Sequence, residues 1–340
     1  MFDQMVTIND IARIANVSKS TVSRVINNYP DVNEKTRQRI IKIMQDNNYW
    51  PNTVARSLST NKSYTIGMFV PTNLNNFFFR EVIQGIEYTL GELGYDLLYF
   101  THQKSLKYYI DTGIKFNFVE KSIDKNVDGL IMLGFNTSNI ERFADLIKSN
   151  IPTVFIDVKL ESENSTYVMS DNYGGARKAI KYLNQLGHRD IGIIIGHSEV
   201  QPSTERYRAC VDTFTELGLK LNQDWIFRVE YLMEEGYSTM QDILEMKERP
   251  TAIFAEDMIA IGAIRAIRDS GLNVPDDFSI IGFDNIELSS HYNLTTINQS
   301  QYDLGGVASR LLMKLINKEK TEPVIVPVDI VKRGSCKNLE

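Results

Sequence analysis

Apolar residues recur at helical spacing in three short runs near the N-terminus. The apolar positions of the first two runs are Ile8, Ile11, Ala12, Ala15, Val22, Val25 and Ile26. This spacing predicts two short helices joined by the polar turn Asn16-Val17-Ser18, with Ser18 as N-cap of the second. A third helix is predicted from Asn33, its N-cap, to about Asn47, with Ile40, Ile41 and Met44 facing inward. Three such helices predict a helix-turn-helix unit, because each is too short to stand alone.

From Tyr64 onward the pattern changes to short apolar runs separated by amphipathic stretches of helical length. The runs are TIGMFVP, YDLLYF, VDGLIML, PTVFID, IGIII, TAIFAE and DFSIIGFD. This alternation predicts an α/β fold with parallel strands, in which helices provide the crossover connections. Ligands of such folds bind beyond the carboxyl ends of the strands, so we expect residues 64–340 to form a ligand-binding body.

Composition excludes several other classes of protein. The chain has 340 residues, of which 43% are hydrophobic, which is enough for two or three packed units. It has no apolar run of membrane-spanning length and no secretory signal, so we expect no membrane contact and a cytoplasmic location. The two cysteines and four histidines are scattered, and no acid/base pair stands out, so we expect no metal, no cofactor and no enzyme activity.

Charge is divided unevenly along the chain. The net charge is −6, yet residues 1–62 hold nine Lys and Arg against five Asp and Glu. Only this small N-terminal part is basic, as expected if it alone meets a polyanion. The polar side of the second predicted helix carries Lys19, Ser20, Ser23, Arg24 and Asn27, which are side chains that reach base edges and phosphates.

The N-terminal segments VTINDIARIANVSKSTVSRVIN, DVNEKTRQRI and NNYWPNTVARSLST resemble the headpiece of the lactose-repressor/galactose-repressor (LacI/GalR) family. The resemblance implies that the second helix enters the major groove of DNA. The positions that it assigns to DNA binding are Thr7, Ser18, Lys19, Ser20, Thr21, Ser23, Arg24, Asn27, Asn52, Ala55 and Leu58.

Residues 51–63, PNTVARSLSTNKS, follow this unit. Pro51 stops the third helix, and Asn52 can cap a helix of one to two turns from Thr53 to Leu58. The resemblance implies that this hinge helix forms on DNA, pairs with its copy, and inserts Leu58 as a wedge into the minor groove. Ala55 would then face the groove floor. An ordinary linker with a buried leucine is the alternative.

Further segments extend the resemblance over nearly the whole chain, among them FFREVIQGIE, MSDNYGGARKAIKYLNQLGHRDIGII and VPDDFSIIGFDNIELS. The family's bodies are similar to two-lobed periplasmic sugar-binding proteins. The implied division is a headpiece at 1–51, a hinge at 52–63 and a body at 64–340. By the same resemblance, lobe one comprises about 64–169 and 300–327, and lobe two about 170–297 and 328–340.

The resemblance also places eight effector-binding side chains between the lobes: Phe78, Phe79, Asp157, Arg206, Tyr231, Glu256, Asp284 and Gln299. Carboxylates that accept from hydroxyls, an arginine that donates to oxygens and aromatic rings that cover an apolar face suit a sugar. Each has another interpretation: Asp157 and Asp284 could cap turns, Arg206 could form an ion pair, and the two phenylalanines could be plain core. At Glu256 the family usually has an amide or an aspartate, and the assignment of Tyr231 depends on counting through a variable loop.

These observations predict a homodimeric transcriptional repressor of a carbohydrate-utilisation operon. It would bind near-palindromic double-stranded operator DNA under the control of a small sugar-like effector. Two alternatives stay open: a global catabolite-control regulator that acts with a phosphorylated carrier protein, and a sugar-binding transport protein. An enzyme built on the α/β body is a more remote third.

Overall fold

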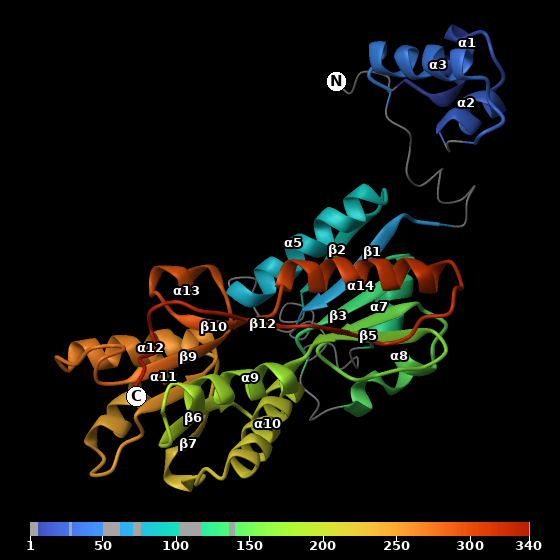
Figure 1. Cartoon of the computed structure of the whole chain (residues 1–340). Helices are drawn as coiled ribbons and strands as arrows, with labels where there is room; N and C mark the ends of the chain where they lie inside the picture. Colours follow the sequence, from blue (N-terminus) through green and yellow to red (C-terminus); the bar gives the residue numbers. More distant parts are fainter. Residues whose placement is uncertain are drawn as a thin grey trace, which may run out of the picture. The chain divides into compact units, whose positions relative to one another are not determined.

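The computed structural model of the chain describes residues 6–26, 29–49, 62–70, 76–101, 117–135 and 140–339. The chain divides into two compact units, Met1–Tyr64 and Thr65–Glu340. The first is called the headpiece below and the second the body. Figure 1 shows the headpiece in dark blue and the body in colours that run from light blue to red.

Within its described residues the headpiece consists of α1 (Ile8–Ile14), α2 (Lys19–Ile26) and α3 (Glu34–Asp46). The three predicted helices are confirmed, and so are two predicted caps. The Ser18 hydroxyl accepts a hydrogen bond from the Thr21 amide at 3.1 Å, and Asn33 accepts one from the Lys35 amide at 2.9 Å. The small core contains Ile11, Ala12, Ala15, Val22, Val25 and Ile40.

The prediction that Ile41 faces inward is wrong. Its side chain is 41% exposed, whereas Ile40 is fully buried and Met44 packs against the headpiece core. Successive helical residues are rotated by about 100°. Ile40 and Met44 therefore share one face of α3, and Ile41 points away from it.

The body contains two six-stranded sheets among the described residues. The first sheet has the order β11-β5-β4-β3-β1-β2, and all its neighbouring strands are parallel. Its strands are β1 (Thr65–Val70), β2 (Asp96–Thr101), β3 (Gly129–Leu133), β4 (Thr153–Ile156), β5 (Ser165–Ser170) and β11 (Val324–Val326).

The second sheet has the order β12-β10-β9-β8-β6-β7. Its strands are β6 (Ile191–Gly196), β7 (Ile226–Val229), β8 (Ala252–Ala255), β9 (Ser279–Asp284), β10 (Thr295–Asn298) and β12 (Asp329–Val331). Four of its five pairings are parallel, and the edge strand β12 runs antiparallel to β10. The predicted two-lobed architecture with parallel sheets is therefore confirmed, apart from this edge strand.

Helices cover both faces of each sheet (Figure 1). On the first sheet, α5 (Phe77–Glu92) and α14 (Gln301–Ile316) cover one face. The other face is covered by α7 (Phe118–Asp124) and α8 (Ala144–Lys148). A short 3-10 turn, Ile140–Phe143, precedes α8. On the second sheet the covering helices are α9 (Asn172–Gln185) with α10 (Gln201–Leu217), and α11 (Met233–Glu245) with α12 (Asp257–Asp269); the short turn Gln223–Trp225 and α13 (Glu287–His291) complete this lobe.

The chain passes between the sheets three times: from β5 to α9, from β10 to α14, and from β11 to β12. We call the part built on the first sheet lobe one and the part built on the second lobe two. Because the chain crosses repeatedly, neither lobe is a continuous stretch of sequence.

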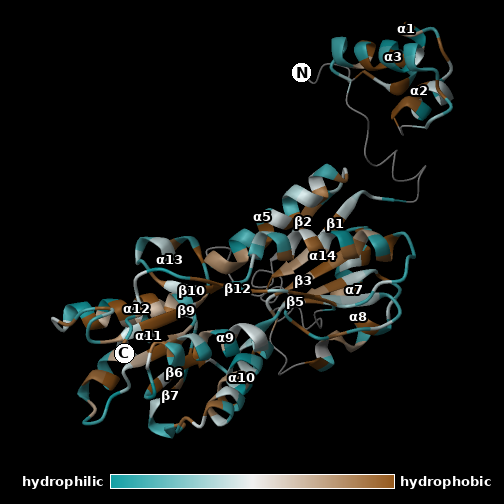
Figure 2. Ribbon diagram, in the orientation of Figure 1, coloured by the Kyte–Doolittle hydropathy of each residue, from teal (hydrophilic) through white to brown (hydrophobic). Residues whose placement is uncertain are grey.

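Each sheet has a core on both faces because side chains alternate along a strand. In β1, for example, Ile66, Met68 and Val70 pack beneath α5 and α14, while Phe69 packs on the opposite face. Figure 2 shows the apolar strands in brown inside layers of helices with teal outer surfaces.

The helix pair α5 and α14 packs at close range because of its glycines. A side chain at Gly305 would place its Cβ 2.0 Å from the Val82 carbonyl oxygen. In the described part of the chain, no helix combines the length and the apolar character needed to cross a bilayer.

Candidate DNA-binding and effector-binding sites

The headpiece presents a polar face on α2. Its buried side chains, Val22 and Val25, hold the helix on the core, while Lys19, Ser20 and Arg24 are exposed. Thr21 and Ser23 are half-buried beside them. The structure thus brings the predicted α2 residues to one solvent-facing surface of the kind that a major groove accepts.

Two of the predicted DNA-binding residues also cap helices. The Thr7 hydroxyl donates to the Asp10 carboxylate at 2.6 Å, and the Thr7 amide donates to the same carboxylate at 3.0 Å. This reciprocal capping box starts α1, as Ser18 starts α2. Both residues therefore have a structural role that is independent of DNA.

Arg24 is held by an acidic residue of the loop that follows α2. Its Nη1 lies 2.6 Å from Asp31 Oδ2, with the two side chains 57% and 50% exposed. Exposed pairs of this kind contribute little, so Arg24 can exchange Asp31 for a DNA group at small cost.

Four predicted DNA-binding residues, Asn27, Asn52, Ala55 and Leu58, lie outside the described residues, as does most of the hinge. Their assignment stays a prediction.

Most of the predicted effector-binding side chains meet in the body around Arg206. We call Asp157, Asn172, Arg206, Glu256, Asp284 and Gln299 the Arg206 cluster. Asp157 follows β4 in lobe one, whereas Glu256 follows β8 and Asp284 ends β9 in lobe two. All three carboxylates thus stand at the carboxyl ends of parallel strands, as expected for a ligand site in such a fold.

Arg206, on α10, is 4% exposed, and each of its nitrogen atoms faces a protein oxygen. Its Nε donates to Asn172 Oδ1 at 2.9 Å, and Nη1 donates to Glu256 Oε1 at 3.1 Å. Nη2 lies 3.6 Å from Asp284 Oδ1, and the guanidinium stacks 3.9 Å above the Phe283 ring. Arg206 thus forms ion pairs with residues of the predicted effector site, so its two interpretations do not exclude each other.

The turn after β9 fixes Asp284 in an uncommon backbone conformation, with φ of 124°. Gln301 donates to its carbonyl oxygen at 2.5 Å, and Gln299 Nε2 donates to its carboxylate at 2.5 Å. Both glutamines belong to the crossover from β10 to α14. Strained residues persist where the surroundings over-determine them, which is common at ligand sites.

Three buried oxygens of the cluster have no hydrogen-bond partner among the described residues: Asp157 Oδ1, Glu256 Oε2 and Gln299 Oε1. Their residues are 8%, 1% and 1% exposed. A buried polar atom without a partner is costly, so groups of this kind call for a ligand or water in the functional protein. All three atoms are acceptors.

Burial and mutual repulsion raise the pKa values of the carboxylates. Burial raises the pKa of Asp157 to about 6, against the opposing effect of Arg206. Burial likewise raises the pKa of Glu256 and that of Asp284, the latter also because Asp257 and Glu256 are close. One guanidinium does not compensate three buried carboxylates.

The remaining predicted side chains surround this cluster less directly. The Tyr231 hydroxyl hydrogen-bonds Ser203, and the Tyr231 ring covers Gly196, where any side chain would clash. Phe78 and Phe79 lie in the first turn of α5, where they pack against each other and against the core of lobe one. Both phenylalanines are half-buried, and their assignment to the effector site stays a prediction.

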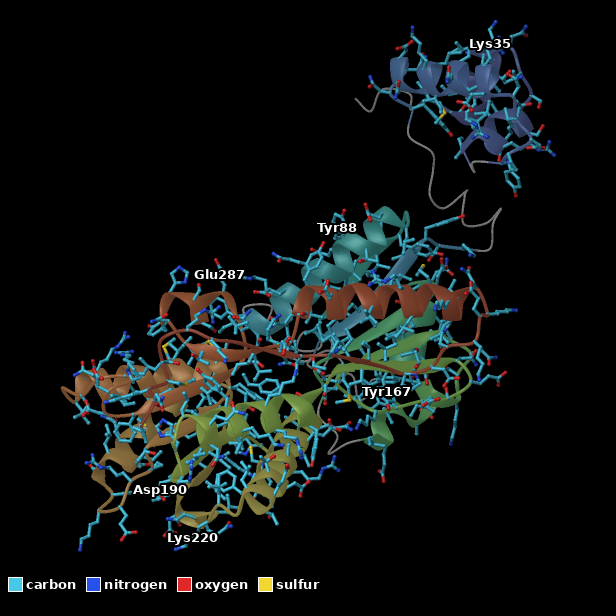
Figure 3. All side chains as sticks on the ribbon, viewed as in Figure 1. Lys35, Tyr88, Tyr167, Asp190, Lys220 and Glu287 are labelled. Atoms are coloured by element: carbon cyan, nitrogen blue, oxygen red, sulfur yellow. The ribbon has the colours of Figure 1, made fainter. Side chains whose placement is uncertain are left out.

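Two ion pairs join the lobes. Lys159, after β4, pairs with Glu205 on α10, the neighbour of Arg206. Arg80 on α5 lies 2.6 Å from Glu287 on α13, which Figure 3 labels. The two lobes are therefore connected through charges as well as through the crossovers.

Asn172 and Phe283 belong to the site, although neither is among the residues predicted from the sequence. Asn172 opens α9 beside its N-cap Asp171, so a polar residue there looked like part of a helix start. Phe283 looked like an ordinary strand residue. Phe283 directly precedes Asp284, and Asn172 lies at the crossover from β5 to α9. These two positions were the available signal.

Comparisons with known proteins identify the family of the chain. Residues 7–52 match the family described as "Bacterial regulatory proteins, lacI family", and residues 180–336 match "Periplasmic binding protein-like domain". The chain is 36% identical over 341 residues to the HTH-type transcriptional repressor PurR of Pasteurella multocida, covering 98% of this chain and 99% of that one. It belongs to the lacI family. This LacI-family chain is a DNA-binding transcriptional repressor, and its relatives are repressors rather than enzymes.

Solved structures show the same architecture. The Lac repressor dimer bound to operator and the anti-inducer ONPF matches with a TM-score of 0.81 and 27% identity, covering 98% of this chain and 100% of that one. A LacI family transcriptional regulator from Enterococcus faecium with bound ribose matches with a TM-score of 0.70 and 26% identity, covering 81% of this chain and 100% of that one.

Proposed function

We propose that this repressor controls a carbohydrate-utilisation operon and that a small sugar-like effector, bound at the Arg206 cluster, sets its affinity for the operator. The observation that carries this proposal is the set of three buried, unpartnered acceptors at Asp157, Glu256 and Gln299. Neighbouring hydroxyls of a sugar would donate to them. The ribose held by the Enterococcus faecium regulator supports the same ligand class.

The coupling to DNA follows from the position of the cluster. Asp157 comes from lobe one and Arg206 from lobe two, so a ligand that bridges them changes how the lobes sit against each other. We propose that residues 52–63 form the hinge that transmits this change, with Asn52, Ala55 and Leu58 as its DNA contacts. Operator DNA would be read by Lys19, Ser20, Arg24 and Asn27, with Thr7, Ser18, Thr21 and Ser23 supporting them.

Two copies of the chain would bind one near-palindromic operator, since two recognition helices then reach successive major-groove faces. The structure of the Lac repressor dimer on its operator supports a homodimer. A repressor acts where its DNA is, so we place the protein in the cytoplasm.

A purine is the second effector class, because the full-length relatives carry the name PurR. Purine bases present ring-nitrogen acceptors as well as donors. Sugars and purines both carry donors for the unpartnered acceptors of the cluster, so the sugar is favoured by the ribose in the Enterococcus faecium regulator and not by these atoms.

The test is a thermal-shift screen of the full-length protein with sugars, sugar phosphates and purine bases. It is followed by fluorescence anisotropy of labelled operator with each compound that stabilises the protein. We expect a sugar to raise the melting temperature and to change operator affinity. A purine that does so, with every sugar inactive, would contradict the proposal.

A further inference from the structure

The first turn of α5 joins lobe one to lobe two. Phe77, the first residue of this helix, packs against the core of lobe two that contains Ile259 and Ile286. One turn further, the Arg80 guanidinium lies 5.1 Å from the centre of the Phe77 ring, and Arg80 Nη2 lies 2.6 Å from Glu287 Oε2 on α13. An aromatic ring and a charge therefore connect the same turn of lobe one to lobe two.

The lobe-two side of this contact is anchored to the turn that carries Asp284. Glu287 opens α13, three residues after Asp284. The Ile286 amide donates to Asp257 Oδ2 at 3.0 Å, and the Ser289 hydroxyl donates to the same oxygen. Because Asp257 is fully buried at the start of α12, it holds the turn after β9 and α13 in place together. Lobe one thus contacts a segment that is continuous with the Arg206 cluster.

A second connection starts from two other residues of the cluster. Lys159, two residues after Asp157 in lobe one, pairs with Glu205, which precedes Arg206 on α10. The Lys159 amide also donates to Gln201 Oε1 at 3.0 Å. Because Gln201 and Glu205 are four residues apart, they lie on one face of α10. The loop after β4 therefore contacts that helix at two points.

These contacts are weak enough to be reversible. The Arg80 and Glu287 side chains are 42% and 61% exposed, and an exposed ion pair shifts an equilibrium by no more than about fivefold. Phe77 is half-buried. Contacts of this size can rebalance two lobe arrangements of similar free energy, whereas a large apolar interface would hold only one of them.

We propose that Phe77, Arg80 and Glu287, together with Lys159 and Glu205, form a clasp that favours the observed lobe arrangement when no effector is bound. The clasp is separate from any contact with the effector, and it makes the resting position of the lobes depend on side chains outside the Arg206 cluster. Its effect on DNA rests on the proposed coupling between the lobes and the hinge, whereas its effect on the lobes does not.

The test measures the distance between the lobes in the effector-free, full-length protein. Spin labels are placed at Lys148→Cys in lobe one and Lys220→Cys in lobe two, which are exposed positions. Cys336→Ser removes the partly exposed native thiol, and Cys210 is buried. An excess of unlabelled protein keeps both labels on one chain of a dimer. Pulsed electron resonance then gives the ratio of the observed arrangement to more open arrangements.

We expect Arg80→Glu to lower this ratio at least about fivefold, because it places two carboxylates side by side. Glu287→Arg should lower it likewise by placing two arginines together. The double variant Arg80→Glu/Glu287→Arg should restore the ratio, which a general loss of structure would not do. Phe77→Ala should also lower the ratio. Lys159→Glu should act as Arg80→Glu does, with Glu205→Lys as its rescue.

Arg177→Glu is the matched control. It breaks an ion pair with Glu216 whose side chains are similarly exposed, at 37% and 41%, but both partners lie in lobe two. This variant should keep the ratio of the wild type. Urea unfolding checks that every variant remains folded.

An unchanged ratio in both Arg80→Glu and Lys159→Glu would overturn the clasp, and so would charge swaps that fail to restore the ratio. Titration of the same variants with operator DNA, selected by the wild-type protein from random duplexes, separates this inference from the proposed function. If the ratio changes and operator affinity does not, the clasp stands and the coupling of the lobes to DNA falls.

Discussion

Arginine serves two different purposes in this repressor. The Arg24 side chain on α2 is 57% exposed and pairs with one exposed carboxylate, whereas the Arg206 side chain on α10 is 5% exposed and is surrounded by buried carboxylates. The first can exchange its partner for DNA at little cost, and the second cannot leave its partners without exposing buried charge. A site that reads an external surface is therefore built from lightly held side chains. A site that senses a small molecule is built from buried groups whose pairing is incomplete.

Among the variants considered, Arg206→Ala should have the largest effect. It leaves three buried carboxylates without their cation, so we expect the free energy of unfolding of the body to fall by about 3 to 5 kcal/mol in urea denaturation. Arg208→Ala is the control: Arg208 is exposed on the same helix and lies 5.1 Å from the Tyr173 ring, so its loss should change the free energy of unfolding by less than about 1 kcal/mol. Equal stability of the two variants would mean that Arg206 does not hold the cluster together.

Asp157→Asn tests the same cluster through pH. The pKa of Asp157 in the folded protein is raised from 3.8 to about 6, so the folded state binds this proton more tightly than the unfolded state. Stability from this group is thus present at low pH and is lost as pH rises through that window. Arg206 and Glu205 are the charged groups that face it, and burial is the main cause.

We expect the wild-type protein without effector to lose up to about 3 kcal/mol relative to Asp157→Asn across that window. The measurement is urea denaturation at a series of pH values, with the exposed Asp242→Asn on α11 as control. Parallel pH profiles of wild type and Asp157→Asn would show that folding does not raise the pKa of Asp157.

Arg24→Ala tests the exposed side of the comparison. We expect a loss of about 1 to 3 kcal/mol in preference for operator over non-specific DNA, because a base contact is removed. The stability of the body should not change. Arg13→Ala, an exposed arginine that pairs with Asp10 on α1, should keep the preference. Anisotropy titrations with operator and scrambled DNA give both values, and an unchanged ratio would rule out base reading by Arg24.

Asp31→Asn should have the smallest effect. The exposed pair with Arg24 is worth less than about 1 kcal/mol, so folding should hardly change. Non-specific DNA binding should tighten, with a salt slope steeper by up to about 0.9, because Arg24 becomes free for a phosphate. Weaker non-specific binding in this variant would indicate that Asp31 positions Arg24 for DNA instead of competing with DNA for it.

Local patterns predicted much of this fold. The three headpiece helices, the caps Ser18 and Asn33 and seven strands of the body follow from spacing and turn chemistry that neighbouring residues determine. The strands β5, β7, β10, β11 and β12 were not among the predicted runs. Several of them are short or rich in polar residues, and their pairing depends on segments far away in the sequence.

The cluster was predictable as a set of residues but not as a set of contacts. Resemblance placed Asp157, Glu256 and Asp284 at one site. The structure joins Glu256 and Asp284 through Arg206, and Asp157 lies within range of the Arg206 charge. The engagement of Arg206 by Asn172 and Phe283 and the unpartnered state of Gln299 Oε1 depend on three-dimensional burial. No spacing rule encodes these features.

The most direct test of the account is the effector response of Asp284→Ala, measured as operator anisotropy against concentration of the compound that the screen identifies. Asp284 joins the cluster to the crossover through Gln299 and Gln301. We expect the variant to bind operator as the wild type does and to ignore the effector, while Asp242→Ala responds normally. A normal dose response of Asp284→Ala would contradict the claim that this cluster controls DNA binding.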